Sequence, residues 1–167
     1  MKKRVVVFLL AAAAVCICAS VAVFFLKSEE HKVKLVLDKL IYLGERPENP
    51  GAAELAVKLG SIDDIFAEQV SLDFGRRFLS GIYSSRSIEP LLVQYRKAFV
   101  RADLKMDDLT VTISPEDTAN AVFSCRLTGK LHRGDQIEEV RDVECRLKKT
   151  EGKWRIEKLE INEVLER

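Results

Sequence analysis

The spacing of hydrophobic residues changes near Asp107 and divides the chain into two parts. Before this point, apolar residues recur every three or four positions, which is the period of one helix face. After it they alternate with polar residues, which is the period of a half-buried strand. Helices followed by strands indicate an α+β fold. We expect three or four helices packed on a curved antiparallel sheet of about four strands.

Glycine and proline separate the predicted helices of the first part. One helix should begin at a Ser28 cap and end near Gly44. Its apolar stripe is formed by Val33, Val36, Leu37, Leu40 and Ile41. A second helix should start at Asn49-Pro50 and stop at Gly60.

Two serines predict further helix starts. Ser61 with Asp64 resembles a capping box for a short helix. Ser87 should cap the last helix, whose apolar face carries Ile88, Leu91, Leu92, Tyr95 and Phe99. Residues 70–86 are ambiguous and fit a short strand or turn followed by a helical turn.

The second part predicts four strands with odd-numbered inward positions. These are Leu109, Val111, Ile113, Ala121, Phe123, Cys125, Leu127, Val143, Cys145 and Leu147. The phase slips in the last strand, because Trp154 and Ile156 are even-numbered whereas Leu159 and Ile161 are odd-numbered. A β-bulge near Lys158 would explain the slip and would curve the sheet.

Parity also constrains the central hairpin. Residues paired across it must have an even sum, which requires a loop of three or five residues unless a bulge intervenes. A loop over residues 134–136 would place Cys125 opposite Cys145, and a five-residue loop would offset them by one pair. The two thiols could be buried and inert or joined in a cross-strand disulfide, and the sequence leaves both readings open.

An uncharged apolar segment, residues 5–26, follows Lys2, Lys3 and Arg4. As a helix it would span about 33 Å, enough for a hydrocarbon core of about 30 Å. We interpret it as an uncleaved single-pass anchor in the cytoplasmic (inner) membrane, with the amino terminus inside. Residues 27–167 would then form a periplasmic domain. The alternatives are a cleaved signal peptide with secretion, and a lipidated cysteine.

The overall composition is an average of these two regions. The 167 residues are 47% hydrophobic and carry a formal net charge of +1. Three of the 27 basic residues precede the apolar segment, so residues 27–167 hold 24 basic against 26 acidic side chains. This balance, with acidic and basic residues mixed on the outer strand faces, argues against nucleic acid as a partner. The expected partners are the lipid bilayer through residues 5–26 and either an envelope protein or a second copy.

The order of elements from Ile88 onward resembles the NTF2-like superfamily, also called cystatin-like or SnoaL-like. The resemblance rests on a serine-capped helix, the strand 107–113, the strand opening 117–123, the strand end 145–149 and the final segment 152–156. The preceding helices fit the same order, so the resemblance covers about residues 29–165. It implies a bent sheet wrapped by helices into a cone, often with a pocket.

The resemblance leaves the activity open, because the superfamily holds isomerases, dehydratases and cyclases as well as binding and assembly modules. Membrane-anchored members include VirB8-like secretion components. Catalytic members place an Asp, His or Tyr inside the cone, which makes Tyr42, Asp73 and Tyr95 our pocket candidates. We expect a non-catalytic binding or assembly module. The alternative is an isomerase- or dehydratase-type enzyme, or a ligand carrier.

The sequence contains no motif typical of a catalytic, cofactor-binding or metal-binding site. His31 and His132 are expected to be solvated, and no base with an orienting partner can be assembled. There is no phosphate loop, dinucleotide fingerprint, HExxH or CxxC motif, so we expect no cofactor and no metal site. The tripeptide Arg133-Gly134-Asp135 is interpreted as ordinary turn chemistry.

Overall fold

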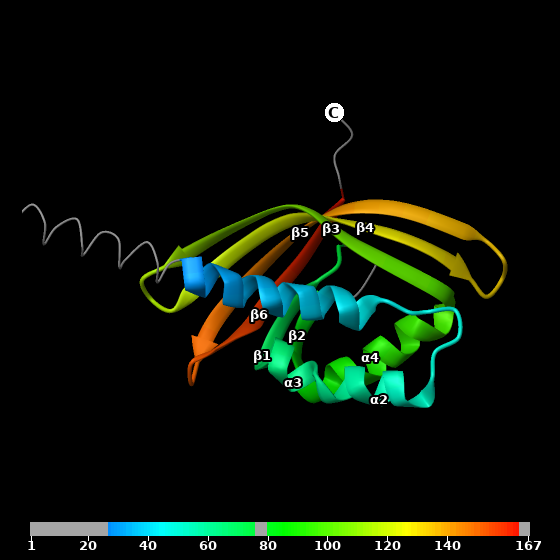
Figure 1. Cartoon of the computed structure of the whole chain (residues 1–167), viewed down its shortest axis with the longest axis horizontal. Helices are drawn as coiled ribbons and strands as arrows, with labels where there is room; N and C mark the ends of the chain where they lie inside the picture. The colour runs from blue at the N-terminus through cyan, green and yellow to red at the C-terminus, as the bar shows by residue number, and fades with distance from the viewer. Residues whose placement is uncertain (1–26, 76–79, 164–167) are drawn as a thin grey trace, which may run out of the picture.

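The computed structural model describes residues 27–75 and 80–163, and it confirms the α+β class. A strongly curved sheet carries helices on its concave side (Figure 1). The helix over residues 27–44 crosses that side. Next to it lie α2 (Ala52–Gly60), α3 (Ile62–Ile65) and α4 (Ser85–Ala98). The apolar segment 5–26 lies outside the described residues. Within them, no helix has the length and apolar character needed to cross a bilayer.

The sheet has six strands in the order β2-β1-β6-β5-β4-β3. Their bounds are β1 Phe66–Asp73, β2 Ser80–Ser84, β3 Phe99–Ser114, β4 Thr118–Leu131, β5 Gln136–Thr150 and β6 Lys153–Glu163. The predicted four-stranded antiparallel meander is β3 to β6. The hairpin β1–β2 comes mainly from the ambiguous segment and adds to β6 with β1 parallel to it. The sheet is therefore larger than expected and mixed.

The predicted boundary between the last helix and the first long strand is wrong. Helix α4 ends at Ala98, and β3 begins at Phe99. Between Asp107 and Thr110 the pairing of β3 with β4 shifts, and Asp108 adopts φ 57° there. This bulge moves the inward positions from even to odd numbers, so the early part of the strand did not match the odd-numbered pattern. The helix N-cap is Ser84 rather than Ser87.

The two other predictions about register are confirmed in part. The pairing of β5 with β6 shifts between Leu147↔Ile156 and Arg146↔Lys158, so a bulge lies beside Lys158 as expected. Strands β4 and β5 pair with an even sum, and their last pair, Lys130↔Gln136, encloses five residues. The capping box at Ser61 is not formed, because its Oγ instead donates to the Lys58 carbonyl at 2.7 Å.

The observed register of β4 and β5 places the two cysteines further apart than either of the two predicted hairpin loops would. Cys125 pairs with Arg141, and Cys145 pairs with Ala121. Four residues along a strand are about 13 Å, whereas disulfides need Cα atoms within about 7 Å. Both thiols are free in the structure. The direct opposition of Cys125 and Cys145 and the one-pair offset are therefore both wrong.

One end of the concave side is filled by apolar side chains. Helix 27–44 inserts Val33 and Leu37, both 0% exposed, against the sheet. The sheet contributes the fully buried Val70, Ala121, Cys145, Leu147 and Ile156. At the rim of this end Glu29 holds the helix, accepting from Trp154 Nε1 at 2.7 Å and pairing with Lys149 at 3.0 Å. The core thus occupies only part of the cone.

Candidate functional site

A cavity of about 970 Å³ occupies the rest of the concave side. Its walls come from the end of helix 27–44, from α4 and from strands β1, β3, β4, β5 and β6. Most of the lining is aliphatic or aromatic, including Leu40, Leu43, Phe74, Leu91, Leu104, Phe123, Leu127 and Leu159. The cavity forms because helix 27–44 covers only part of the concave face of the sheet. The inward-facing side chains of the strands extend past this covered part.

Tyr95 is a polar group that faces this cavity from α4. Its ring packs on Phe99, with the centroids 4.9 Å apart. Burial, and then the nearby Cys125, raise the pKa of Tyr95 to about 12, so the hydroxyl stays protonated at neutral pH. Within the described part of the chain the hydroxyl has no hydrogen-bond partner. It is therefore a donor available to an occupant of the cavity.

Cys125 and Arg141 add two more donors on the opposite wall. They face each other across β4 and β5, and both line the cavity. Burial raises the pKa of the Cys125 thiol. Glu139, two residues before Arg141, accepts from its Nη2 at 3.1 Å and Nε at 3.4 Å. Glu139 and Arg141 are partly exposed, which places this ion pair where the cavity meets solvent.

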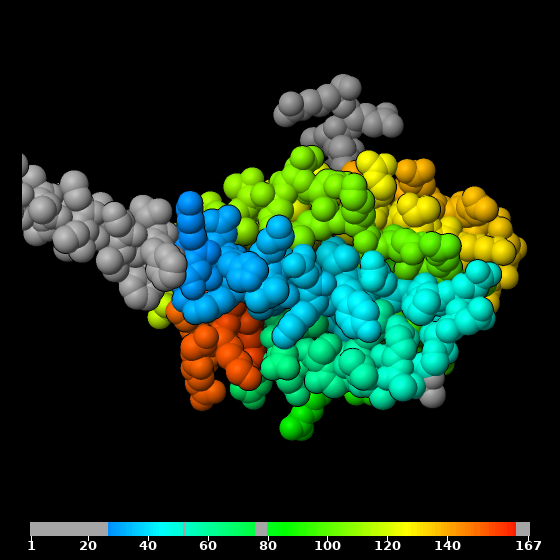
Figure 2. Space-filling view, in the orientation of Figure 1, coloured from blue at the N-terminus to red at the C-terminus, as the bar shows by residue number. Residues whose placement is uncertain are grey.

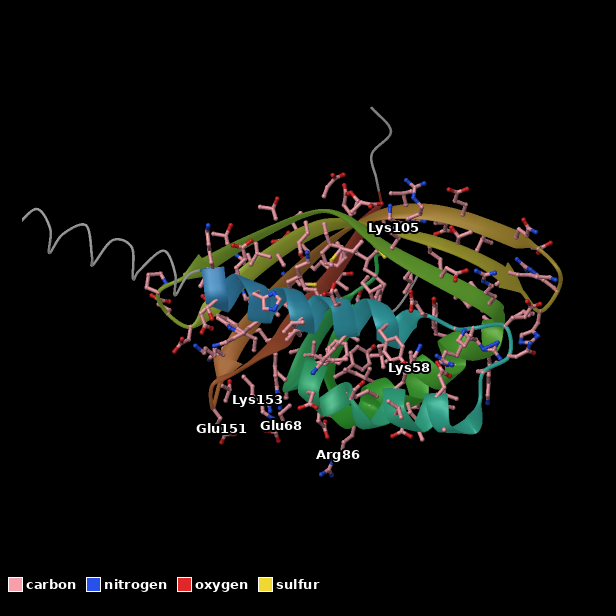
Figure 3. The ribbon with its side chains drawn as sticks, in the orientation of Figure 1. Lys58, Glu68, Arg86, Lys105, Glu151 and Lys153 are labelled. Atoms are coloured by element: carbon pink, nitrogen blue, oxygen red, sulfur yellow. The ribbon has the colours of Figure 1, made fainter. Side chains whose placement is uncertain are left out.

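A buried ionic cluster holds the wall formed by the end of helix 27–44. Lys58 and Arg96 both donate to the Glu45 carbonyl, at 2.6 and 2.7 Å. The same two cations pair with Glu54 at 2.9 and 2.6 Å. Burial would raise the pKa of Glu54, but hydrogen bonds from Lys58 and Arg96 outweigh it and lower that pKa. Figure 3 shows Lys58 between helix 27–44 and the layer of α2 and α4.

The structure brings only one of the three predicted pocket residues to the cavity. Tyr95 lines it, whereas Tyr42 is 46% exposed and lies under Lys58 Nζ at 4.2 Å from the ring centroid. Asp73 ends β1 outside the lining and accepts from Ser80 Oγ at 2.7 Å. This bond and one from the Gly75 amide lower the pKa of Asp73. His31 and His132 are exposed, as expected.

The sequence interpretation missed Arg141 and Arg96. Arg141 sits at an odd position of β5, so the parity rule that placed Val143 and Cys145 inside could have placed it there as well. Arg96 follows Leu92 by four residues and thus continues the buried face of α4. For Lys58 the sequence showed only part of the signal: the pairing with Glu54, four residues earlier on the same helix, is visible in it, but the contact with the Glu45 carbonyl depends on the fold.

No group of three or more His, Cys, Asp and Glu side chains within residues 27–75 and 80–163 is arranged to hold a metal ion. Across that same region, the ionisable groups that line the cavity are Tyr95, Cys125, Glu139 and Arg141. The site can therefore bury an apolar body and offer hydrogen-bond donors to a polar group.

Comparisons with known proteins agree with this architecture. The solved structure of the Kfla4162 protein from Kribbella flavida matches with a TM-score of 0.69 and 13% identity, over 84% of this chain and 94% of that chain. An NTF2-like protein with a cystatin-like fold from Novosphingobium aromaticivorans matches with a TM-score of 0.68 and 15% identity, over 86% of each chain.

An enzyme is among the similar structures. A hexachlorocyclohexane dehydrochlorinase (LinA) type 2 matches with a TM-score of 0.68 and 11% identity, over 83% of this chain and 86% of that chain. At these identities the likeness concerns the fold. No curated protein sequence matches the chain. The SnoaL-like domain model matches residues 57–160, and the chain therefore belongs to the SnoaL-like domain family, as its cone-shaped fold indicates.

Proposed function

We propose that the domain binds a small, predominantly apolar molecule in the cone cavity without chemical conversion. The observation that carries this proposal is the cavity of about 970 Å³ with its largely aliphatic and aromatic lining. Small-molecule sites commonly have volumes of about 300–1,000 Å³ and a few polar groups in an apolar wall. Binding of an apolar molecule in such a cavity is favourable, because apolar surfaces of the molecule and of the wall are removed from water.

The alternative is an isomerase- or dehydratase-type enzyme, for which the fold of a dehydrochlorinase offers precedent. Such a reaction needs a base that can take a proton inside the cavity. Tyr95 and Cys125 both have raised pKa values and stay protonated near pH 7. Glu139 is engaged by Arg141 at the solvent boundary. These states favour binding over proton abstraction. Turnover of a small molecule that is lost in Tyr95→Phe would overturn the non-catalytic role.

We also propose that residues 5–26 anchor the chain in the cytoplasmic membrane with the domain outside the cytoplasm. The support is the charge-free apolar run after Lys2, Lys3 and Arg4. Retention of the chain in membranes at alkaline pH, with protease digestion of residues 27–167 only from the periplasmic side, is the expected result. Release of the chain into the soluble fraction would contradict the anchor.

Calorimetric titration of octanamide into the full chain in lipid nanodiscs tests the cavity, with empty nanodiscs subtracted. Octanamide has an apolar body and a small neutral head. Leu127→Trp fills the cavity from β4, and we expect it to reduce binding at least tenfold. Val122→Trp is the matched control, because Val122 lies on the outer face of the same strand and is 48% exposed. Equal binding by the wild type and Leu127→Trp would contradict the proposal.

A further inference from the structure

Gly44, the last residue of helix 27–44, lies against Leu104 of β3, and both residues line the cavity. A β-carbon built on Gly44 would collide with Cδ1 of Leu104. The backbone does not require a glycine here, because residue 44 is helical and its φ lies outside the left-handed region. Alanine is also more favourable than glycine in a helix. The glycine at position 44 therefore provides space for the side chain of Leu104.

Hydrogen bonds fix the backbone beside this contact. The Arg46 amide donates to the Ala102 carbonyl at 2.7 Å, and the Ala102 amide donates to the Arg46 carbonyl at 2.9 Å. Gly44 comes two residues before Arg46, and Leu104 comes two residues after Ala102, so this antiparallel bridge brings the two lining residues together. The Arg46 guanidinium adds two hydrogen bonds to carbonyl groups at the start of β3. A side chain at position 44 would therefore displace the end of the Leu104 side chain rather than the backbone.

The contact between Gly44 and Leu104 belongs to the inner wall of the cavity. The mouth is marked by exposed lining residues, which are Gly75, Gln94, Glu139 and Asn162. Among the described residues that line the cavity, none from helix 27–44 or β3 is exposed. Leu104 is paired with Leu127 of β4, which lines the cavity beside it. The open side of Leu104 is thus the cavity, and a side chain moved off Gly44 would enter the space available to a ligand.

We propose that Gly44 and Leu104 determine the length of ligand that the cavity accepts, and that the apolar end of the ligand lies against Leu104, away from the mouth. This inference rests on the proposed binding function and identifies the residues that limit ligand size. By leaving room for Leu104 beside the helix, Gly44 keeps the inner end of the cavity open. A larger residue at position 44 would narrow that end and leave the mouth unchanged.

Octanamide and decanamide test the proposal, because they share a head group and differ by two methylene groups. Both are titrated calorimetrically into the full chain in nanodiscs, with empty nanodiscs subtracted. We expect the wild type to bind decanamide about tenfold more tightly than octanamide, as the burial of two methylene groups provides. In Gly44→Ala this ratio should fall below about twofold, because the additional methylene groups no longer fit, while octanamide binding changes less than about threefold. Adding Leu104→Ala to Gly44→Ala should restore the ratio, because the displaced side chain is removed.

Gly60→Ala is the matched control for a glycine-to-alanine change at a helix end. Gly60 is the last residue of α2, and a β-carbon built there would have no other atom within 4 Å. The ratio should equal that of the wild type in this variant. If Gly44→Ala does not fold, Leu104→Trp fills the same place from β3 and should lower the ratio in the same way.

The outcomes separate this inference from the proposed function. An unchanged ratio in Gly44→Ala, or equal weakening of both ligands, would overturn the role of Gly44 in selecting ligand length. A ratio that stays low in the double variant would overturn the role of Leu104. Equal affinities of octanamide and decanamide for the wild type would overturn the placement of the apolar end and leave the cavity as a binding site. Failure of both ligands to bind the wild type would overturn the proposed function and this inference together.

Discussion

The same two strands build a solid core at one end of the cone and a cavity wall at the other. On β4, Ala121 is 0% exposed, whereas Leu127 faces the cavity. On β5, Leu147 is 0% exposed, whereas Arg141 lies at the cavity boundary. The difference arises from helix 27–44, whose apolar stripe fills only the first end (Figure 2 shows this helix along one face of the molecule). An alternating strand pattern therefore identifies an inward face without showing whether anything fills it.

The two ends are also held by different interactions. The filled end depends mainly on side-chain packing, which is strongest where no void remains, and the contacts of Glu29 add to it at the rim. The walls of the cavity have no packing partner on one side, and buried polar contacts hold them. Lys58 and Arg96 bind the Glu45 carbonyl, and Arg46 donates to the carbonyls of Phe99 and Val100, both at 2.7 Å. These hydrogen bonds fix the chain segments that border the cavity.

The largest expected effect is a loss of packing at the filled end. Leu147→Ala should lower the free energy of unfolding by about 4 kcal/mol, because a fully enclosed side chain leaves a void. Leu127→Ala removes the same atoms from a wall that already faces a cavity, so we expect a loss below about 1 kcal/mol. Urea denaturation of both variants measures the difference. Equal losses would show that the second end is as tightly packed as the first.

The buried ionic cluster gives the second prediction. Glu54→Gln leaves Lys58 and Arg96, 1% and 6% exposed, without their anionic partner. We expect a loss of about 3 kcal/mol, because removing one member of a buried pair strands the other charge. Asp64→Asn is the control, since its contact with Lys153 is exposed and 3.6 Å long. A loss below that of Asp64→Asn would mean that the cluster does not stabilise the cavity wall.

The sequence was sufficient to predict the α+β class, the meander β3 to β6 and the bulge in β6. These features depend on local alternation and its phase, which are visible in one chain. The strands β1 and β2 were not predicted as a pair, because their hairpin is stabilised by parallel pairing with β6, about 90 residues later in the sequence. The even-numbered start of β3 was missed because the bulge at Asp108 reversed its parity.

The candidate site was less predictable than the fold. Tyr95 could be placed in the cavity because the helical period positions it on the inner face of α4. Asp73 and Tyr42 could not be excluded, since the end of β1 and the exposed side of helix 27–44 are defined only by their neighbours. Arg141 shared its parity with core residues, but its charge suggested an outer position. A charged residue at an inward-facing position of a strand is thus expected where a cavity meets solvent. Such a residue can indicate a binding site in the sequence.

Glu29 at the filled end provides the third prediction, which depends on pH. A hydrogen bond from Lys32, then contacts with Lys149 and Trp154, outweigh burial and lower the pKa of Glu29 to about 2. Its stabilising contribution is therefore complete above pH 4.5 and lost as pH falls toward 2. Glu29→Gln should cost about 1–2 kcal/mol at pH 7 and progressively less below pH 4.5.

Unfolding free energies measured from pH 7 to pH 3 check this dependence. Glu30→Gln is the control, because Glu30 is an exposed neighbour on the same helix turn. We expect it to change stability little at any pH. A cost for Glu29→Gln that stays constant across this range would show that the carboxylate does not hold the helix through its charge.

The last prediction compares the two ends of the cone through the reactivity of one cysteine at each end. Cys145 belongs to the filled end and is 0% exposed, whereas Cys125 lines the cavity. Burial, and then Glu144, raise the pKa of Cys145 to about 12, and burial raises that of Cys125 as well. We expect a small maleimide to modify Cys125 slowly in the folded chain and Cys145 only after unfolding. Bound octanamide should slow the reaction at Cys125, because it occupies the cavity.

Peptide mass spectrometry after timed labelling measures each site and separates both from Cys16 and Cys18. Cys125 and Cys145 lie on neighbouring strands of one sheet, so a difference between them reports packing rather than membership of different elements. Equal rates of modification of Cys125 and Cys145 in the folded chain would contradict the difference in packing between the two ends of the cone. A disulfide-linked peptide pair from unreduced protein would contradict the register of β4 and β5, because that register keeps the two Cα atoms too far apart for the bond.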